Sequence, residues 1–146
     1  MTSVSAIALF SGAHFSPKKA LFIISATMLV SDLVLGFHGV MWATYGSMVV
    51  TMLLGRVLTR KSVGRIVAVG ALSSIIFYLL TNFAVWAIEG SMYPKTVMGL
   101  WQSYVMGLPF FRNSLAGDFL YTASFFGMYE IVSFLKAKHA IRVVRT

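Results

Sequence analysis

The chain has 146 residues, of which 58% are hydrophobic and only 11% are charged. A soluble domain of this length cannot bury so much apolar surface, so the composition favours lipid as the solvent of the chain. The absence of Cys excludes disulfides, thiolate metal sites and Cys nucleophiles. The basic residues behind the net charge of +8 lie in clusters between apolar runs, which is typical of membrane proteins and not of nucleic-acid binders.

Apolar runs follow one another along the whole chain and predict an all-α membrane protein with a single domain, residues 1–146. Four runs are each long enough to span a bilayer as a helix: residues 20–36, 40–58, 66–88 and 114–135. Residues 3–15 are apolar but short, which fits a thin or tilted span, or a span cut down from something longer. A cleavable signal peptide fits poorly, because no basic residue precedes this run. The runs therefore predict a bundle of about five transmembrane helices.

Basic residues gather in three places between these runs, and they set the predicted orientation. The clusters are Lys18 and Lys19; Arg56, Arg60, Lys61 and Arg65; and Lys136, Lys138, Arg142 and Arg145. The cytoplasmic segments of membrane proteins carry an excess of Lys and Arg. All three clusters, and with them the C-terminus, are therefore predicted to be cytoplasmic.

The segment 97–111 is predicted to enter and leave on the outer side as a short re-entrant or interfacial helix. The three basic clusters share one side only if this segment does not cross the membrane. It is also too short for a span, and Gly99, Gly107 and Pro109 are expected to break it. We expect it to fold back as a lid over an outward cavity, with Arg112 near Asp118 at its rim.

Polar residues that are unusual in such sequence gather on the outer side in this orientation. An ionisable side chain within a membrane is costly unless it is paired or hydrated, so it marks a functional site by default. The candidate substrate-binding residues are Asp32, His38, Asn82, Trp86, Tyr93, Arg112, Asn113 and Asp118. No metal site, cofactor or catalytic residue is predicted, because the His residues share no ligand spacing and no protease motif is present.

Most of these residues also have a structural interpretation that the sequence leaves open. The planar fork of Arg112 suits a carboxylate, which either Asp32, Asp118 or a substrate anion could supply. Asn113 could be the N-cap of the last helix, and His38 could simply sit at the interface. Trp86 and Tyr93 could belong to an aromatic belt at the outer membrane surface.

Three segments resemble a bacterial family of integral-membrane proteins of unknown function that are labelled as transport proteins. They read SAIALFSGAHF, then SDLVLGFHG, then YLLTNFAVWAIEGSMYPKTVMGLWQSYVMGLPFFRNSLAGDFLYT, and the TNF, MYP, LPFFRN and GD elements are the most specific. That family is more loosely similar to the substrate-binding S components of energy-coupling factor (ECF) vitamin transporters, six-helix proteins with an outward cavity. Its members carry a further hydrophobic helix before the segment matching Ser5 to Phe15. The resemblance thus implies six spans in the full family and five here.

Two classes of function follow from these expectations, and an enzyme is not expected. The favoured function is the binding of a small solute in an outward polar and aromatic cavity and its movement across the bacterial inner membrane. No ATP-binding motif occurs in the chain, so an ATP-driven version needs an energy-coupling partner. The alternative is a membrane scaffold or assembly factor whose polar residues lock helices together. The lipid bilayer is the expected partner in both cases.

Overall fold

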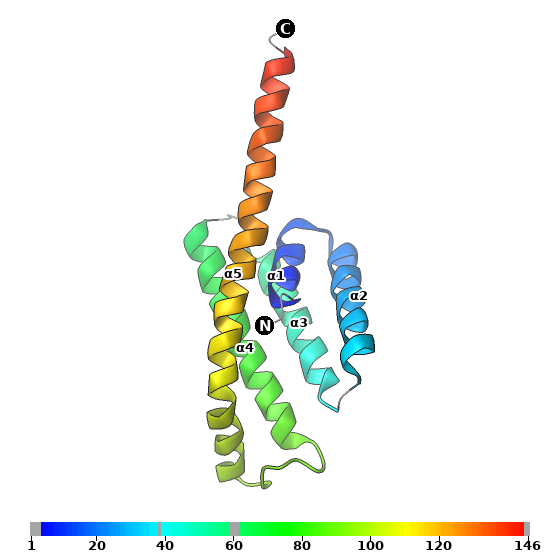
Figure 1. The fold of residues 1–146 in the computed structure, drawn as a ribbon, viewed down its shortest axis with the longest axis vertical. Helices are drawn as coiled ribbons and strands as arrows, with labels where there is room; N and C mark the ends of the chain where they lie inside the picture. Colours follow the sequence, from blue (N-terminus) through cyan, green and yellow to red (C-terminus); the bar gives the residue numbers. More distant parts are fainter. Residues whose placement is uncertain (1–3, 38, 59–61, 145–146) are drawn as a thin grey trace.

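The computed structural model describes residues 4–37, 39–58 and 62–144 (Figure 1). Within that part of the chain the fold is all-helical, with five helices and no strand. The helices are α1 (Val4–His14), α2 (Pro17–Leu35), α3 (Met41–Arg56), α4 (Val63–Ala87) and α5 (Val97–Val144). The prediction of an all-α protein is confirmed, and three of the predicted runs match α2, α3 and α4. The short helix expected in addition to about five spans is not a separate element.

Local signals explain where these helices begin and end. Pro17 stands at the start of α2, where its missing N–H has no helical partner to lose, after Ser16 in an extended conformation. Gly36 follows α2 with a φ of 91°, and Gly90 follows α4 with a φ of 74°. Only glycine takes such a backbone conformation without strain, so both positions turn the chain where an apolar run stops.

The short helix α1 lies at the centre of the bundle. It packs against all four other helices, whereas α2 packs only against α1 and α3. α4 and α5 form a long hairpin, and α1 begins about halfway along the bundle (Figure 1). The buried core has two parts: one contains Val4, Ala8, Ala20, Ile24, Met28, Met48 and Met52, and the other contains Leu9, Leu58 and Phe126.

The basic clusters lie at one end of the bundle. Lys18 and Lys19 stand at the start of α2, Arg56 at the end of α3 and Arg65 at the start of α4, and all four are exposed. The C-terminal part of α5, with the exposed Lys136 and Lys138, extends beyond the other helices at the same end (Figure 1). Arg60, Lys61 and Arg145 lie outside the described residues. The bundle therefore has a basic end and an opposite end formed by the α2–α3 turn and the α4–α5 loop.

Only α4, among the helices in the described residues, is long and apolar enough to cross a bilayer by its length and composition. α1 and α3 are too short, with 11 and 16 residues, against the roughly 20 that a span needs. α2 contains Lys18, Lys19 and Asp32, and α5 is diluted by charged residues. A helical bundle is thus shown, with one candidate span.

The predicted break between 97–111 and the last helix is wrong. Residues 97–111 are the beginning of α5, which continues through Pro109 to Val144. The glycines serve packing instead of breaking the helix: a Cβ on Gly107 would overlap the side chain of Asn82, and one on Gly99 would overlap the carbonyl of Pro94. Pro109 lies on the exposed side of α5 and is accommodated within the continuous helix. There is consequently no lid.

The continuity of α5 can be measured as a distance. We expect spin labels on Met98→Cys and Phe134→Cys, both at exposed positions, to be about 54 Å apart, since an α-helix rises 1.5 Å per residue. Electron–electron double resonance on the purified protein measures this separation, and the chain has no native Cys to interfere. Labels on Leu120→Cys and Phe134→Cys lie beyond Pro109 and serve as the control, with about 21 Å expected. If the distance between labels at 98 and 134 is clearly shorter than expected while that between labels at 120 and 134 is as expected, residues 97–111 fold back and α5 is not continuous.

Candidate functional site

The most buried carboxylate of α5 lies where α1, α4 and α5 meet. Asp118 is 7% exposed, and its Oδ2 accepts a hydrogen bond of 2.8 Å from the Ser74 hydroxyl. Ser5, in the first turn of α1, is buried and lines a small cavity beside Asp118. Ser73 and Thr122 are also buried and line the same small cavity, of about 10 Å³. We call Asp118, Ser5, Ser73, Ser74 and Thr122 the Asp118 cluster.

Small residues bring the three helices close enough to form this cluster. Gly70 lies one turn before Ser74 on α4 and lines the cavity, as does Ala6 on α1. Ser74 also donates to the Gly70 carbonyl at 3.1 Å, and Ser73 donates to the Val69 carbonyl at 2.9 Å. Such bonds to the preceding turn keep a serine hydroxyl satisfied inside an apolar helix.

Sequence reasoning singled out Asp118 but missed the four hydroxyl residues around it. Thr122 lies one turn after Asp118 and shares its helix face, and the Ser73-Ser74 pair interrupts an otherwise apolar run. Those two signals were available from the sequence. Ser5 carried none, because nothing in the sequence shows that α1 packs against α5.

An ion pair between Arg112 and Asp118, one of the alternatives that the sequence left open, is not formed. On a continuous helix the two residues are about 9 Å apart along the axis and about 120° apart around it. Asp118 therefore faces the bundle, whereas Arg112 is exposed. Asn113 is exposed beside it in the middle of α5, so it is not the N-cap of a last helix.

Asp32 occupies a second buried polar site, away from α5. It is 4% exposed and accepts a hydrogen bond of 2.7 Å from the hydroxyl of Tyr45 on α3. Because α2 packs against α1 and α3 only, Asp32 does not approach Arg112 or Asp118. The structure thus does not gather the predicted residues into one cavity. His38 lies outside the described residues.

Asn82, Trp86 and Tyr93 lie at the α4–α5 hairpin, at the end opposite the basic clusters. Asn82 donates to the Tyr78 carbonyl at 2.8 Å, and Trp86 Nε1 donates to the Pro94 carbonyl at 2.9 Å. The backbone N–H of Tyr93 donates to the hydroxyl of Ser91 at 3.2 Å. Of these bonds, that of Trp86 links α4 to the α4–α5 loop, whereas those of Asn82 and Tyr93 are local.

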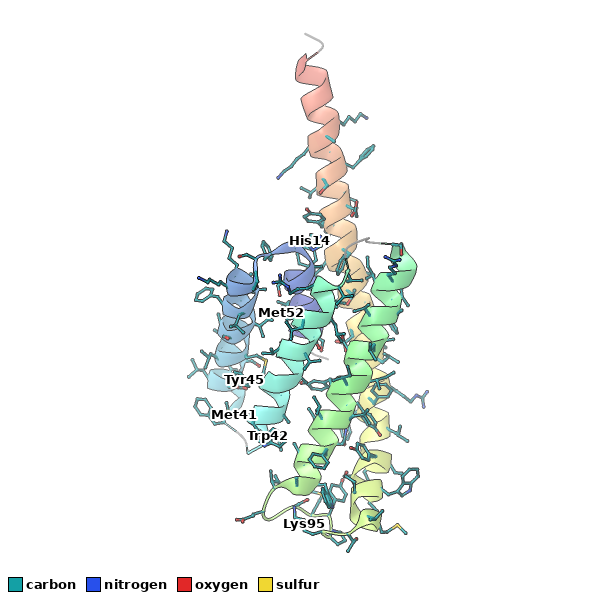
Figure 2. The ribbon with its side chains drawn as sticks, turned by 180° about the vertical axis from the view of Figure 1, so that it is seen from behind. His14, Met41, Trp42, Tyr45, Met52 and Lys95 are labelled. Carbon is teal, nitrogen blue, oxygen red and sulfur yellow. The ribbon has the colours of Figure 1, made fainter. Side chains whose placement is uncertain are left out.

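Lys95 is not among the predicted site residues, but its side chain binds carbonyl groups at the end of α4. Its ammonium group donates to the carbonyls of Trp86 and Ile88 and lies 5.6 Å from the centre of the Trp86 ring. Figure 2 labels Lys95 at the hairpin end of the bundle. A cation beside the last carbonyls of a helix offsets their partial negative charge.

Comparisons with known proteins give one match. Residues 1–141 match the model of a family described as a family of unknown function, DUF6580. No match was found among curated proteins or among solved structures. Within the described residues there is no group of three or more His, Cys, Asp or Glu side chains that could hold a metal ion.

Proposed function

We propose that this chain, which belongs to the DUF6580 family, is a multi-pass protein of the bacterial inner membrane that binds a small solute and moves it across the bilayer. It does so alone or with an energising partner. The observation that supports this function best is the Asp118 cluster. It lies beside the middle of α4, the helix with the length and composition of a membrane span.

A carboxylate at that depth is a poor structural choice. Within a membrane an ionisable side chain is expensive, and such residues mark substrate or ion pathways and proton relays. Asp118 accepts its hydrogen bond from the Ser74 hydroxyl, and replacing both partners of such a bond by apolar groups of the same shape can be nearly neutral for stability. A role in binding or in a conformational step gives a reason for keeping it.

An organic solute needs a larger site than the Asp118 cavity. A cavity of about 10 Å³ is at the lower limit for one water molecule. We therefore propose that the solute binds nearer the hairpin end, where the Asn82 amide and the Trp86 indole N–H would exchange their bonds to the Tyr78 and Pro94 carbonyls for bonds to the solute. The Asp118 cluster then lies further along the path towards the basic end. A solute of vitamin size is what the sequence resemblance to ECF S components implies, although no solved structure matches the chain.

Ligand-dependent thermal unfolding tests this function. The purified protein is screened in detergent against a panel of water-soluble vitamins, amino acids and monosaccharides. A compound present at 100 times its dissociation constant should stabilise the folded state by about 2.7 kcal/mol. Trp86→Phe removes the indole N–H that bonds Pro94, and we expect it to weaken the effect, whereas Trp42→Phe, on α3, should leave it intact. If no compound in the panel acts and mass spectrometry of the denatured protein detects no bound small molecule, solute binding is excluded.

The surface of α5 favours a second candidate, a membrane scaffold. Arg112 and Asn113 are exposed among exposed apolar side chains, including Phe110 and Leu120. If α5 lies in lipid beside α4, the guanidinium needs a carboxylate from another helix, since a lone charge facing lipid is costly. The panel separates the two candidates, because a scaffold has no reason to be stabilised by any small molecule.

A further inference from the structure

We propose that the Asp118 cluster is a binding site for a sodium ion. The proposal rests on the proposed function only in treating the ion as part of a transport cycle, since binding itself can be measured without transport. The juxtaposition of one buried carboxylate with four hydroxyls around a cavity of about 10 Å³ carries the inference.

If Asp118 is ionised, its carboxylate needs an opposite charge nearby. The carboxylate is 7% exposed, and a buried ionised carboxylate is very unfavourable unless it is paired. The nearest cationic residue on its own helix, Arg112, points away into the surroundings. Among the described residues, those that line the cavity besides the cluster are Ala6, Leu9 and Gly70, none of which carries charge. A single bound monovalent cation supplies the missing charge.

The oxygen atoms of the cluster suit a small hard cation. Two carboxylate oxygens and the hydroxyls of Ser5, Ser73, Ser74 and Thr122 provide up to six donors from three helices. Carboxylate, hydroxyl and carbonyl oxygens favour hard ions over transition metals. One carboxylate balances a charge of one, whereas Ca²⁺ sites commonly draw on several. The small cavity favours sodium over the larger potassium ion.

The hydrogen bonds of the two serines leave their oxygen atoms available as ligands. The Ser74 hydroxyl has one proton and two acceptors in range, Gly70 O at 3.1 Å and Asp118 Oδ2 at 2.8 Å. When a cation occupies the carboxylate, that proton can be donated to Gly70, and the lone pairs of Ser74 turn towards the ion. Ser73 already donates to Val69 at 2.9 Å. The preceding helical turn thus accepts both protons, and neither hydroxyl has to point its proton at the cation.

Thermal unfolding of the purified full chain in sodium chloride, compared with potassium chloride at equal ionic strength, tests the site. We expect sodium to raise the melting temperature saturably and potassium to have no such effect. Asp118→Asn should abolish the sodium increment. Ser74→Ala should raise the sodium concentration for half-maximal stabilisation at least about tenfold. The matched control is Ser124→Ala on α5, which removes a serine bonded to its preceding turn, Leu120 O at 2.8 Å, outside the cluster.

Equal stabilisation by the two salts would overturn the proposal, and so would a sodium increment that survives in Ser74→Ala as it does in Ser124→Ala. If Asp118→Asn fails to fold, the two serine variants still decide the outcome. Stabilisation by acid in the absence of any sodium effect would assign the site to a proton and reject the ion. Stabilisation by sodium without stabilisation by any compound in the solute panel would support the ion site and contradict solute binding. Stabilisation by a compound in the panel without stabilisation by sodium would support solute binding and contradict the ion site.

Discussion

Gly55→Ala is expected to destabilise the protein strongly, whereas Gly46→Ala in the same helix should be neutral or slightly stabilising. A Cβ on Gly55 would overlap the carbonyl oxygen of Leu9 on α1, whereas a Cβ on Gly46 meets nothing within 4 Å. Because the obstacle is backbone, it cannot rotate away, and the two helices must separate. We expect a loss of about 3 kcal/mol, at the upper end of what overpacking costs, and a gain of up to about 1 kcal/mol for Gly46→Ala from helix propensity.

The same contact exists in the reverse sense, which allows a sharper check. A Cβ on Gly12 of α1 would overlap the carbonyl oxygen of Met52 on α3. Once Gly12→Ala has moved the helices apart, Gly55→Ala has less left to disturb, so the double variant should cost less than the sum of the single variants. Thermal unfolding of the four proteins in one detergent measures these differences. If Gly55→Ala behaves like Gly46→Ala, α1 does not lie against α3 as described.

The helices that were predicted well are those whose ends are fixed by local chemistry. α2 begins at Pro17 and ends before Gly36, and both residues act on their own backbone regardless of the rest of the fold. Such signals are legible in a single sequence. The positions of the basic clusters can be explained in the same way. Two helices, α2 and α3 or α4 and α5, separate each cluster from the next, so all the clusters lie at the same end of the bundle.

The start of α5 was predicted wrongly because its signals depend on tertiary contacts. Gly107 looks like a helix breaker in the sequence, but in the fold it makes room for Asn82 of the neighbouring helix. Its cost in helix propensity is about 1 kcal/mol, which close packing along the hairpin can offset. Only knowledge that α4 lies against α5 at this point would have reversed the prediction.

The candidate site shows the same division. Asp118 stood out because a carboxylate is rare in such sequence, and its burial agrees with that selection. Its link to Arg112 was inferred from a break at Pro109 that does not exist, and the link to Asp32 required α2 and α5 to be neighbours, which they are not. The hydroxyls of Ser5 and Ser74 come from two other helices, so the site could be recognised only once the packing of α1 was known.

Cysteine labelling should give an all-or-none result for the membrane topology. Met92 lies in the α4–α5 loop and is 85% exposed, and Lys138 is exposed on α5 at the basic end. Since basic segments stay in the cytoplasm, a membrane-impermeant maleimide applied to intact spheroplasts should label Met92→Cys fully. It should label Lys138→Cys only after permeabilisation. The chain has no Cys of its own, so the background should be low.

A third position separates a membrane protein from a soluble bundle with the same fold. Ile75, near the middle of α4, is 43% exposed in the isolated structure. Water would reach a cysteine there if the bundle were soluble, whereas lipid would exclude both water and the thiolate that the maleimide reaction requires. We therefore expect Ile75→Cys to stay unlabelled in spheroplasts and after permeabilisation, and to react once the protein is denatured. Labelling of Ile75→Cys in the intact membrane fraction would contradict the bilayer as the environment of α4 and, with it, the transport proposed for the Asp118 cluster. Labelling of Lys138→Cys from outside would contradict the predicted orientation.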